Sequence, residues 1–167
     1  MVVLDKTERE IIKLLQKDGR MSFVDMAEQI GVTEGTIRRK FYRLLEEGVI
    51  KIAAVTDPFE VGFNAPAIIG LNVDQSRIRE IVEQLTRLPR VHYVAMTTGI
   101  YDIIVYAFFS DNKEMASFLL EDLSKIDGIT NTQTSLVLDI YKQDFAIGLP
   151  QRQEEGRRRR RRSAAPR

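Results

Sequence analysis

Near the N-terminus, apolar residues recur at helical spacing in three short segments, each bounded by residues that start and stop helices. On the third segment, Ile37, Phe41 and Leu44 fall on one face. Glu8 follows the first capping residue, Asp5, by three positions, which is the spacing of a capping box. The pattern therefore predicts three short helices. The capping residues are Asp5, Ser22 and Thr33, and the glycines that end the helices are Gly19, Gly31 and Gly48.

A β-rich stretch, VIKIAAV at residues 49–55, follows the third helix and predicts a strand. Three short helices with a tight glycine-containing turn between the second and third, followed by a strand, form the order of a winged helix-turn-helix. We therefore expect residues 1–52 to form a DNA-binding domain. The next stretch collects prolines and a glycine among polar residues, and it predicts a linker or hinge over residues 53–66.

From residue 67 onward, the pattern changes to alternating strands and helices. A shift of 38 residues aligns the apolar positions of its two halves, for example Val82 with Leu120. Two βαβ halves make an α+β, ferredoxin-like βαββαβ domain, which we expect to span residues 67–147. The expected strands are 67–73, 91–96, 102–109 and 129–141, and the expected helices are 76–88 and 112–126.

The third expected strand, DIIVYAFF at residues 102–109, is apolar at both alternating sets of positions, as in a strand buried on both faces. Right-handed crossovers place both helices on the same face of the sheet, so the opposite face needs another cover. Because a large exposed apolar patch usually marks an interface, we expect a second subunit to pack there. The alternative cover is the first domain or the C-terminal segment of the same chain.

Composition removes several classes of site. The chain has no cysteine and one histidine, His92, so it offers no thiolate chemistry and too few ligands for a typical zinc or iron centre. We therefore expect no metal, no cofactor and no catalytic residues. No window approaches the roughly 18 continuous apolar residues of a membrane span, and the N-terminus lacks a signal-peptide pattern. These features predict a cytoplasmic protein without membrane contact.

Charge is distributed unevenly along the chain. Residues 1–57 carry 10 basic and 10 acidic residues, residues 58–150 carry 7 and 12, and residues 151–167 carry 8 and 2. The tail, residues 148–167, includes six consecutive arginines, and we expect it to be disordered because such a run of like charges cannot pack. It either adds nonspecific affinity for phosphates or is an idle extension.

The third helix carries an unbroken basic octet, TIRRKFYR, in which no acid interrupts the cations. An ordinary solvated helix face mixes the two signs of charge, so this octet after a helix-turn-helix spacing favours contact with DNA. The alternative is a solvated amphipathic helix whose spacing arises by accident. The residues that we expect to contact double-stranded DNA are Ser22, Thr33, Thr36, Arg38, Arg39, Lys40 and Arg43.

With these elements in place, the chain resembles the Lrp/AsnC (feast/famine) family of bacterial and archaeal transcription regulators from about Leu4 to Phe145. The segments that carry the resemblance are the helical region from LDKTERE to LLEEGVI, the hinge VTDPFEVGF, the loop TTGIYDIIV and the strand GITNTQTSLVL. The resemblance implies a winged helix-turn-helix joined to an effector-binding domain, dimers that often assemble into octamers, and amino acids or related small molecules as effectors.

The resemblance also implies roles for individual residues. Thr36, Arg39 and Arg43 fall where the family's recognition helix contacts DNA. For the effector, the family uses the loop between the middle strands, facing the last strand of a neighbouring subunit. Here the loop residues are Thr97, Thr98, Gly99, Tyr101 and Asp102, and the strand residues are Thr132, Thr134 and Ser135. Gly99 frees backbone N–H groups to approach a carboxylate, and Asp102 can pair with an α-ammonium.

Other interpretations of the same sequence stay open. The effector residues can equally form a surface turn followed by an exposed edge strand. Some heme-pathway decarboxylases of the siroheme type share the two-domain architecture, but His92 is the only histidine available for acid or base chemistry here. A stand-alone amino-acid sensor without DNA binding is a third interpretation, against which the intact basic helix argues.

Overall fold

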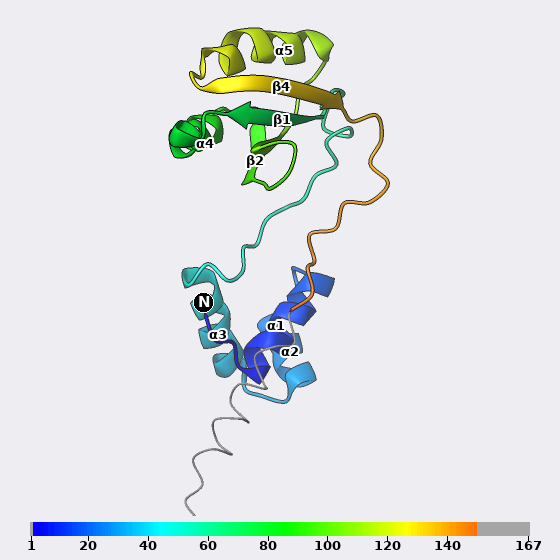
Figure 1. The fold of residues 1–167 in the computed structure, drawn as a ribbon. Helices are drawn as coiled ribbons and strands as arrows, with labels where there is room; N and C mark the ends of the chain where they lie inside the picture. Colours follow the sequence, from blue (N-terminus) through cyan, green and yellow to red (C-terminus); the bar gives the residue numbers. More distant parts are fainter. Residues whose placement is uncertain (1, 150–167) are drawn as a thin grey trace, which may run out of the picture. The chain divides into compact units, whose positions relative to one another are not determined.

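The computed structural model describes residues 2–149 and divides them into two compact units (Figure 1). The first unit contains residues 2–54 together with residues 144–149, and the second contains residues 55–143. The predicted basic tail lies outside the described residues from position 150 onward. Each unit has a hydrophobic core of its own.

The first unit is built from three helices, α1 (Lys6–Lys17), α2 (Phe23–Ile30) and α3 (Glu34–Glu46), and the predicted caps are confirmed. Asp5 and Glu8 form a reciprocal capping box at the start of α1, while the side chains of Ser22 and Thr33 accept backbone N–H groups of α2 and α3. Gly31 ends α2 with a φ of 77°, a left-handed conformation that favours glycine. The helices enclose a core centred on Ile11, Ile12, Met26, Ala27, Ile37 and Leu44.

The prediction of a strand at residues 49–55 is wrong. Residues 51–55 have no regular secondary structure and are exposed. A strand is stabilised by pairing its backbone N–H and C=O groups with a neighbouring strand. Among the described residues, no strand pairs with this segment. High β propensity alone therefore does not form a strand here.

The C-terminal segment, residues 144–149, returns to the first unit. Leu149 is partly buried against its hydrophobic core, and Gln16 Nε2 of α1 donates a hydrogen bond of 2.8 Å to the carbonyl oxygen of Ile147. The DNA-binding unit predicted at residues 1–52 therefore also includes a short segment from the other end of the chain.

The second unit contains one antiparallel sheet in the order β2-β3-β1-β4, which is the predicted ferredoxin-like arrangement. Its strands are β1 (Ala67–Val73), β2 (Val91–Met96), β3 (Ile103–Ala107) and β4 (Ile129–Leu136). Helix α4 (Ile78–Thr86), preceded by the 3-10 turn η1 (Gln75–Arg77), connects β1 to β2. Helix α5 (Asn112–Ser117) continues through the π-helical turn η2 (Phe118–Asp122) and the 3-10 turn η3 (Leu123–Lys125) towards β4.

The end of β4 and the exposure of Leu120 differ from the expectation. Strand β4 ends at Leu136 rather than at residue 141, and Leu138 and Tyr141 beyond it are exposed. Leu120, which the internal repeat aligns with the partly buried Val82, is 75% exposed. Leu120 lies in the π-helical turn η2, and a π turn contains more residues than an α turn, which rotates the following side chains out of helical register.

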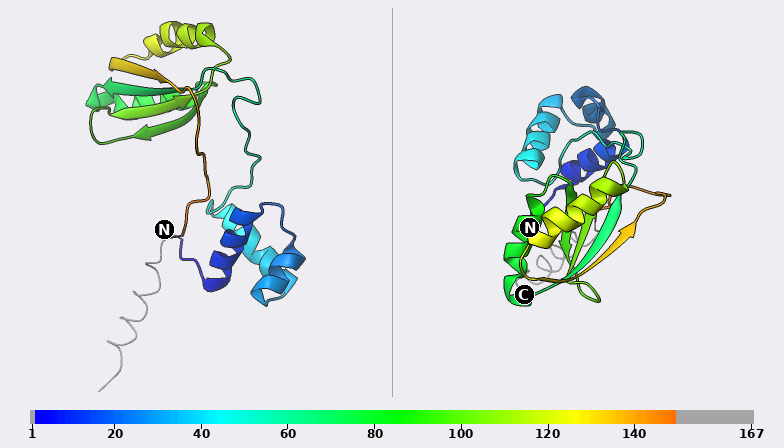
Figure 2. Two further views of the ribbon diagram at one scale, coloured as in Figure 1. Left: turned by 90° about the vertical axis from the view of Figure 1, so that its right-hand side faces the viewer. Right: turned by 90° about the horizontal axis from the view of Figure 1, so that it is seen from above.

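Both helical segments cover the same face of the sheet (Figure 2), where their buried side chains contact those of the strands. On β3, the residues Ile103, Val105 and Ala107 belong to this buried face, as the predicted alternation requires. The opposite face carries Ile104 and Tyr106, which are only partly buried. Its other apolar residues include Ile68, Tyr93 and Phe108, and the last of these contacts the ring of Phe63 at 5.8 Å.

The part of the predicted linker nearest to the sheet packs with the second unit. Pro58 and Ala65 are buried, and the backbone N–H of Ala65 donates to the carbonyl oxygen of Phe109. Residues 51–57 are exposed, so the extended connection is shorter than the predicted 53–66 at its C-terminal end.

Tyr101 lies against the backbone of Gly70 on the open face of the sheet. A Cβ atom at position 70 would lie 2.6 Å from the ring atoms Cγ and Cδ2 of Tyr101. The Tyr101 hydroxyl forms a hydrogen bond with Gln133 of β4. The ring therefore crosses over β1 and contacts the edge strand β4. Only glycine leaves room for this arrangement.

We therefore expect Gly70→Ala to lower the free energy of unfolding of the second unit by about 1–3 kcal/mol, because the methyl group forces the Tyr101 ring off the sheet. Chemical denaturation of the full chain measures the change. In the background of Tyr101→Ala, Gly70→Ala should cost less, because the clash is gone. An equal cost in both backgrounds would show that the ring is not the obstacle.

Candidate DNA-binding face and effector loop

Helix α3 begins at a turn that fixes its first residues. The hydroxyl of Thr33 accepts the backbone N–H of Thr36 at 3.3 Å, and the two threonine hydroxyl oxygens lie 2.9 Å apart. Ser22 has the same role on α2, where it caps the helix and its hydroxyl donates to Asp25 at 2.7 Å. These three residues, all predicted to contact DNA, therefore also shape the helix-turn-helix.

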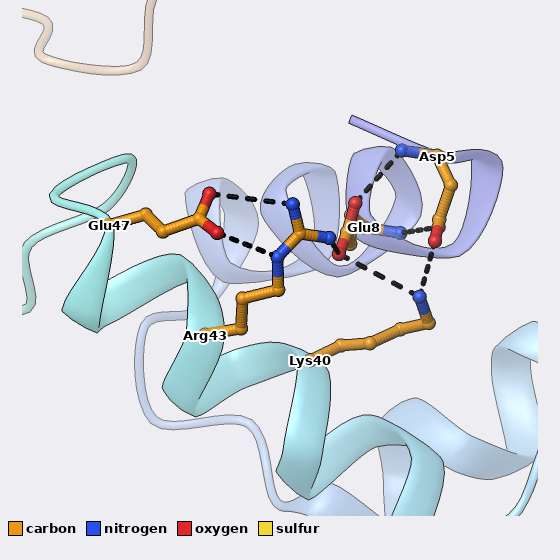
Figure 3. Close-up of polar contacts among 5 residues, drawn as sticks. All are labelled: Asp5, Glu8, Lys40, Arg43 and Glu47. Carbon is orange, nitrogen blue, oxygen red and sulfur yellow. Dashed lines mark hydrogen bonds and ion pairs between the residues drawn. The ribbon is translucent and has the colours of Figure 1, made fainter. Parts of the chain in front are cut away.

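The carboxylate of Glu8 is buried between α1 and α3 and has three polar partners, while the backbone N–H of the same residue donates a further hydrogen bond (Figure 3). Its Oε2 accepts the backbone N–H of Asp5 at 2.9 Å, and its own N–H donates to Asp5 Oδ1 at 3.0 Å. Its Oε1 accepts a hydrogen bond of 2.7 Å from Nη1 of Arg43 and lies 3.7 Å from Nζ of Lys40. A buried carboxylate needs such partners, because desolvation disfavours its charge.

Lys40 and Arg43 are thereby drawn towards α1. Lys40 also pairs with the Asp5 carboxylate, and its side chain is 16% exposed. Arg43 keeps about half of its side chain exposed and forms a second ion pair with Glu47, from Nε to Oε1 at 2.9 Å (Figure 3). The acids that face the basic octet come from other positions in the chain, so the octet's lack of acids does not make its cations free.

The ion pair with Lys40 also affects the titration of Asp5. Partial burial raises the pKa of Asp5, but the hydrogen bond from Lys40 and those from the backbone of the capping box outweigh burial and lower the pKa below its usual value. A carboxylate with a lowered folded-state pKa stabilises the fold at neutral pH. This contribution is lost as the pH falls through that pKa.

The two other cations of α3 face solvent. The side chain of Arg38 pairs with Glu34 one turn earlier, Nη2 to Oε1 at 2.7 Å, and its guanidinium lies 5.0 Å from the ring centroid of Phe23. Arg39 is exposed, and it forms no ion pair or hydrogen bond with the described part of the chain. Arg39 is therefore the cation of α3 that is most available to a ligand.

The predicted effector loop lies between β2 and β3 and is held at both ends. The hydroxyl of Thr97 donates to the carbonyl oxygen of Tyr101 at 2.6 Å, and the N–H of Thr97 donates to the carbonyl oxygen of Asp102 at 2.9 Å. The Asp102 carboxylate accepts the N–H of Val73 at 2.9 Å and Nε2 of Gln75 at 2.6 Å. Asp102 therefore anchors the loop to the end of β1.

The tip of the loop presents backbone groups to solvent. Thr98 and Ile100 are exposed, and Gly99 has a φ of 126°, a conformation that L side chains rarely adopt. Nδ2 of Asn72 on β1 donates to the carbonyl oxygen of Ile100 at 2.6 Å, which ties the tip back to the sheet. The five predicted loop residues thus form one continuous structure.

The predicted residues of β4 do not share one face. Thr132 and Thr134 pair with Leu71 and Ile69 of β1, and with Leu119 they line a groove on the helix-covered side. Ser135 pairs with the exposed Ile68 and lies on the open face of the sheet. Tyr101 reaches this open side through its contact with Gln133. Within one chain, the loop and the threonines therefore lie on opposite sides of the sheet.

Sequence reasoning missed Glu8, Asp5 and Glu47 as members of the α3 surface. Glu8 carried a signal as the third residue of a capping box, but its pairing with Arg43 joins positions 35 residues apart. It also missed Asn72 and Gln133, which hold the loop. Such partners follow only from the packing of the elements.

Two further kinds of site have no counterpart in residues 2–149. This range contains no group of three or more histidine or acidic side chains that could hold a metal ion. Its helices are all too short or too polar to cross a bilayer.

Comparison with known proteins agrees with the two-unit architecture. Residues 66–147 match a family model described as the Lrp/AsnC ligand binding domain, and residues 4–51 match one described as winged helix-turn-helix DNA-binding. An uncharacterized HTH-type transcriptional regulator of Pyrococcus abyssi is 40% identical over 146 residues, which cover 87% of this chain and 92% of that protein.

Solved structures have the same fold. A transcriptional regulator of Neisseria meningitidis, crystallised as a complex with L-Met, superposes with a TM-score of 0.77 at 26% identity and covers 89% of this chain and 97% of its own. Escherichia coli AsnC, at 24% identity, superposes with a TM-score of 0.76 over 85% of this chain and 97% of its own. The second likeness shows the fold alone.

The Glu8 network predicts a specific loss of stability. Glu8→Ala should lower the free energy of unfolding of the first unit by about 1–3 kcal/mol, because it removes the acceptor of the Asp5 N–H in the capping box and the partner of Arg43 and Lys40. Glu10→Ala is the matched control, since Glu10 lies on the same helix and, within residues 2–149, forms an ion pair only with the exposed Lys13. The control should change the free energy by no more than about 0.5 kcal/mol. Equal effects in chemical denaturation would contradict the role of Glu8.

Proposed function

This chain belongs to the Lrp/AsnC family of transcriptional regulators, and from that premise we propose that it binds a pseudo-palindromic DNA site as a dimer, under the control of a small effector molecule. The two copies of α3 would enter successive major grooves about 34–36 Å apart, or a multiple of that distance. Acting on DNA, the protein would reside in the cytoplasm.

The observation that carries the proposal is the solvent-facing side of α3. Arg39 is exposed and has no partner among residues 2–149, so its guanidinium is free to bind a guanine edge or a phosphate. Arg38 lies beside it in an exposed pair with Glu34, and such pairs are weak enough to exchange for a phosphate. Thr36 is only partly buried and lies one turn before Lys40. Lys40 and Arg43 would contribute mainly by orienting α3 on α1.

Dimerisation is supported by the open face of the sheet. This face exposes Ile68 and Tyr93 and leaves Tyr106 partly buried, so it offers apolar area that a second copy would cover. We propose the dimer as the unit that binds DNA, and octamers as assemblies of four such dimers.

The effector would be an amino acid or a related small molecule bound between subunits. The Neisseria meningitidis regulator of the same fold was crystallised with L-Met. In this chain, Gly99 is exposed and has no side chain to block the approach of a carboxylate to the loop backbone, and Asp102 fixes the loop at the end of β1. Thr132, Thr134 and Ser135 of a neighbouring subunit would complete the cleft. Such an effector acts by binding one arrangement of subunits more tightly than another.

The decarboxylase alternative gains no support from the matched family models or from the relatives. His92 is exposed and contacts the ring of Phe108 at 4.9 Å, and no second histidine exists to share acid and base roles.

Arg39→Ala tests the DNA-binding face. We expect at least about a tenfold loss of affinity for DNA sites selected by the wild-type protein from a random pool, since one bidentate contact is worth about 1–3 kcal/mol. Fluorescence anisotropy measures the affinity, and analytical ultracentrifugation should show unchanged assembly. The matched control is Arg79→Ala, which removes an exposed arginine from α4 of the second unit. Unchanged affinity in Arg39→Ala would remove this residue from the interface.

Asp102→Ala tests the effector loop. A thermal-shift screen of the twenty amino acids should identify a ligand that raises the melting temperature of the wild-type protein by mass action. Asp102→Ala should abolish that shift because it releases the loop from β1, while affinity for DNA without the ligand should persist. Asp127→Ala, at an exposed carboxylate that pairs with Arg77, is the control and should leave the shift in place. A full shift in Asp102→Ala would contradict the proposed site.

A further inference from the structure

Three aromatic rings pack together where the start of α2 meets the middle of α3. The ring centroid of Phe23 lies 5.0 Å from that of Phe41 and 6.3 Å from that of Tyr42, and the rings of Phe41 and Tyr42 are 5.5 Å apart. All three pairs meet edge to face, an arrangement that aromatic rings favour. The orientation of the Tyr42 ring is therefore fixed by two neighbours.

Tyr42 presents this aromatic cluster to solvent. It is 49% exposed, whereas Phe23 and Phe41 are partly buried. Within residues 2–149, the Tyr42 hydroxyl forms no hydrogen bond. Tyrosine is common at interfaces because its apolar ring can pack while its hydroxyl binds a polar partner. In Tyr42 the ring is held by the protein, and the hydroxyl is available to a ligand.

The two solvent-facing cations of α3 are the surface neighbours of Tyr42. Arg38 precedes it by four residues and Arg39 by three, and residues at these spacings lie next to each other on a helix. The guanidinium of Arg38 lies 5.0 Å from the centroid of the Phe23 ring, so the same ring contacts both Arg38 and Tyr42. The free hydroxyl therefore lies beside two exposed guanidinium groups, where an anion is attracted.

We propose that Tyr42 is a further DNA-contacting residue, whose hydroxyl donates a hydrogen bond to a backbone phosphate beside the contacts of Arg38 and Arg39. The inference rests on the proposed function. In a helix-turn-helix, the N-terminal residues of the recognition helix contact base edges, while the preceding helix crosses the DNA backbone. Tyr42 lies in the second half of α3 and contacts Phe23 of α2. A phosphate is therefore a better partner for its hydroxyl than a base edge.

Phe23 is a positioning residue in this arrangement. It contacts the Tyr42 ring edge to face and the Arg38 guanidinium through its own ring face, and it needs no contact with DNA. Side chains that are held in place before binding lose less conformational entropy when a ligand arrives. Phe23 therefore lowers the cost of the contacts that Tyr42 and Arg38 make.

An exposed aromatic cluster can also bind another protein. Val24, which follows Phe23, is 51% exposed and adds apolar area to this surface. The observations favour DNA because Tyr42 shares a helix surface with two arginines, whose charge matches that of phosphates. A protein-binding role predicts that loss of the hydroxyl leaves DNA affinity unchanged.

Tyr42→Phe tests the hydroxyl, because it keeps the ring and its packing. Fluorescence anisotropy of the full chain should show about three- to tenfold weaker binding, as expected for one lost hydrogen bond. The loss should be the same for the selected DNA site and for an unrelated duplex of equal length, since phosphate contacts do not distinguish sequences. The matched control is Tyr141→Phe, at a tyrosine of the second unit that is 94% exposed, and it should bind as the wild-type protein does.

Three results would overturn the proposal. Wild-type affinity in Tyr42→Phe would remove the hydroxyl from the interface and leave protein binding as the role of the cluster. A loss confined to the selected site would assign the hydroxyl to a base edge. A loss of equal size in Tyr141→Phe would show that the effect is not specific to α3.

The role of Phe23 has its own test in a double-mutant cycle with Tyr42→Phe. Phe23→Leu keeps an apolar side chain but removes the ring, so the Tyr42 hydroxyl should contribute less to DNA affinity in that background. A loss of stability alone would lower the folded fraction equally with and without the hydroxyl. Independent effects of the two substitutions would therefore contradict the positioning role.

The inference and the proposed function fail separately. If Arg39→Ala weakens binding and Tyr42→Phe does not, Tyr42 is removed and the α3 face remains the interface. If the wild-type protein selects no duplex from a random pool, the proposed function itself fails.

Discussion

The buried carboxylate of Glu8 is the constraint on which the arrangement of the first unit depends. It closes the capping box that starts α1, and it binds Arg43 and lies beside Lys40 from α3. A carboxylate removed from water is tolerated only where hydrogen bonds and opposite charges replace its hydration. The position of α3 against α1 is therefore set by charge as well as by the apolar core, and a shift of either helix would leave this group without partners.

This constraint divides the basic residues of α3 between two roles. The cations nearest to α1 orient the helix, and the cations on the outer arc, Arg38 and Arg39, face solvent. An interface that presents few free cations on a firmly held helix favours geometric recognition over bulk attraction, because phosphate contacts carry affinity and base contacts carry specificity.

The sequence was sufficient to predict features that depend on local rules. The caps at Asp5, Ser22 and Thr33 and the buried alternation of β3 follow from hydrogen-bonding chemistry and periodicity within a few residues, and both are confirmed. Features that depend on distant partners were not predictable in this way. The segment at 49–55 has strand propensity but no pairing strand in the described chain, and the π turn at Leu120 shifts a register that the repeat had suggested. The basic composition of α3 was evident from the sequence, but not which of its cations are free, since that depends in part on acids 35 residues away.

The second unit couples its loop to its open face through one ring. Tyr101 belongs to the loop that is proposed to bind effector, yet its ring lies over Gly70 and its hydroxyl binds Gln133, both on the sheet face that is proposed to meet a second copy. Because Tyr101 is part of this loop, a ligand that moves the loop would also shift the ring from its contact with Gly70. Packed surfaces respond to such displacements by changing between discrete arrangements rather than by deforming continuously. A small molecule can therefore change the spacing of the two DNA-binding units through the subunit interface itself. No separate signalling element in the chain is needed.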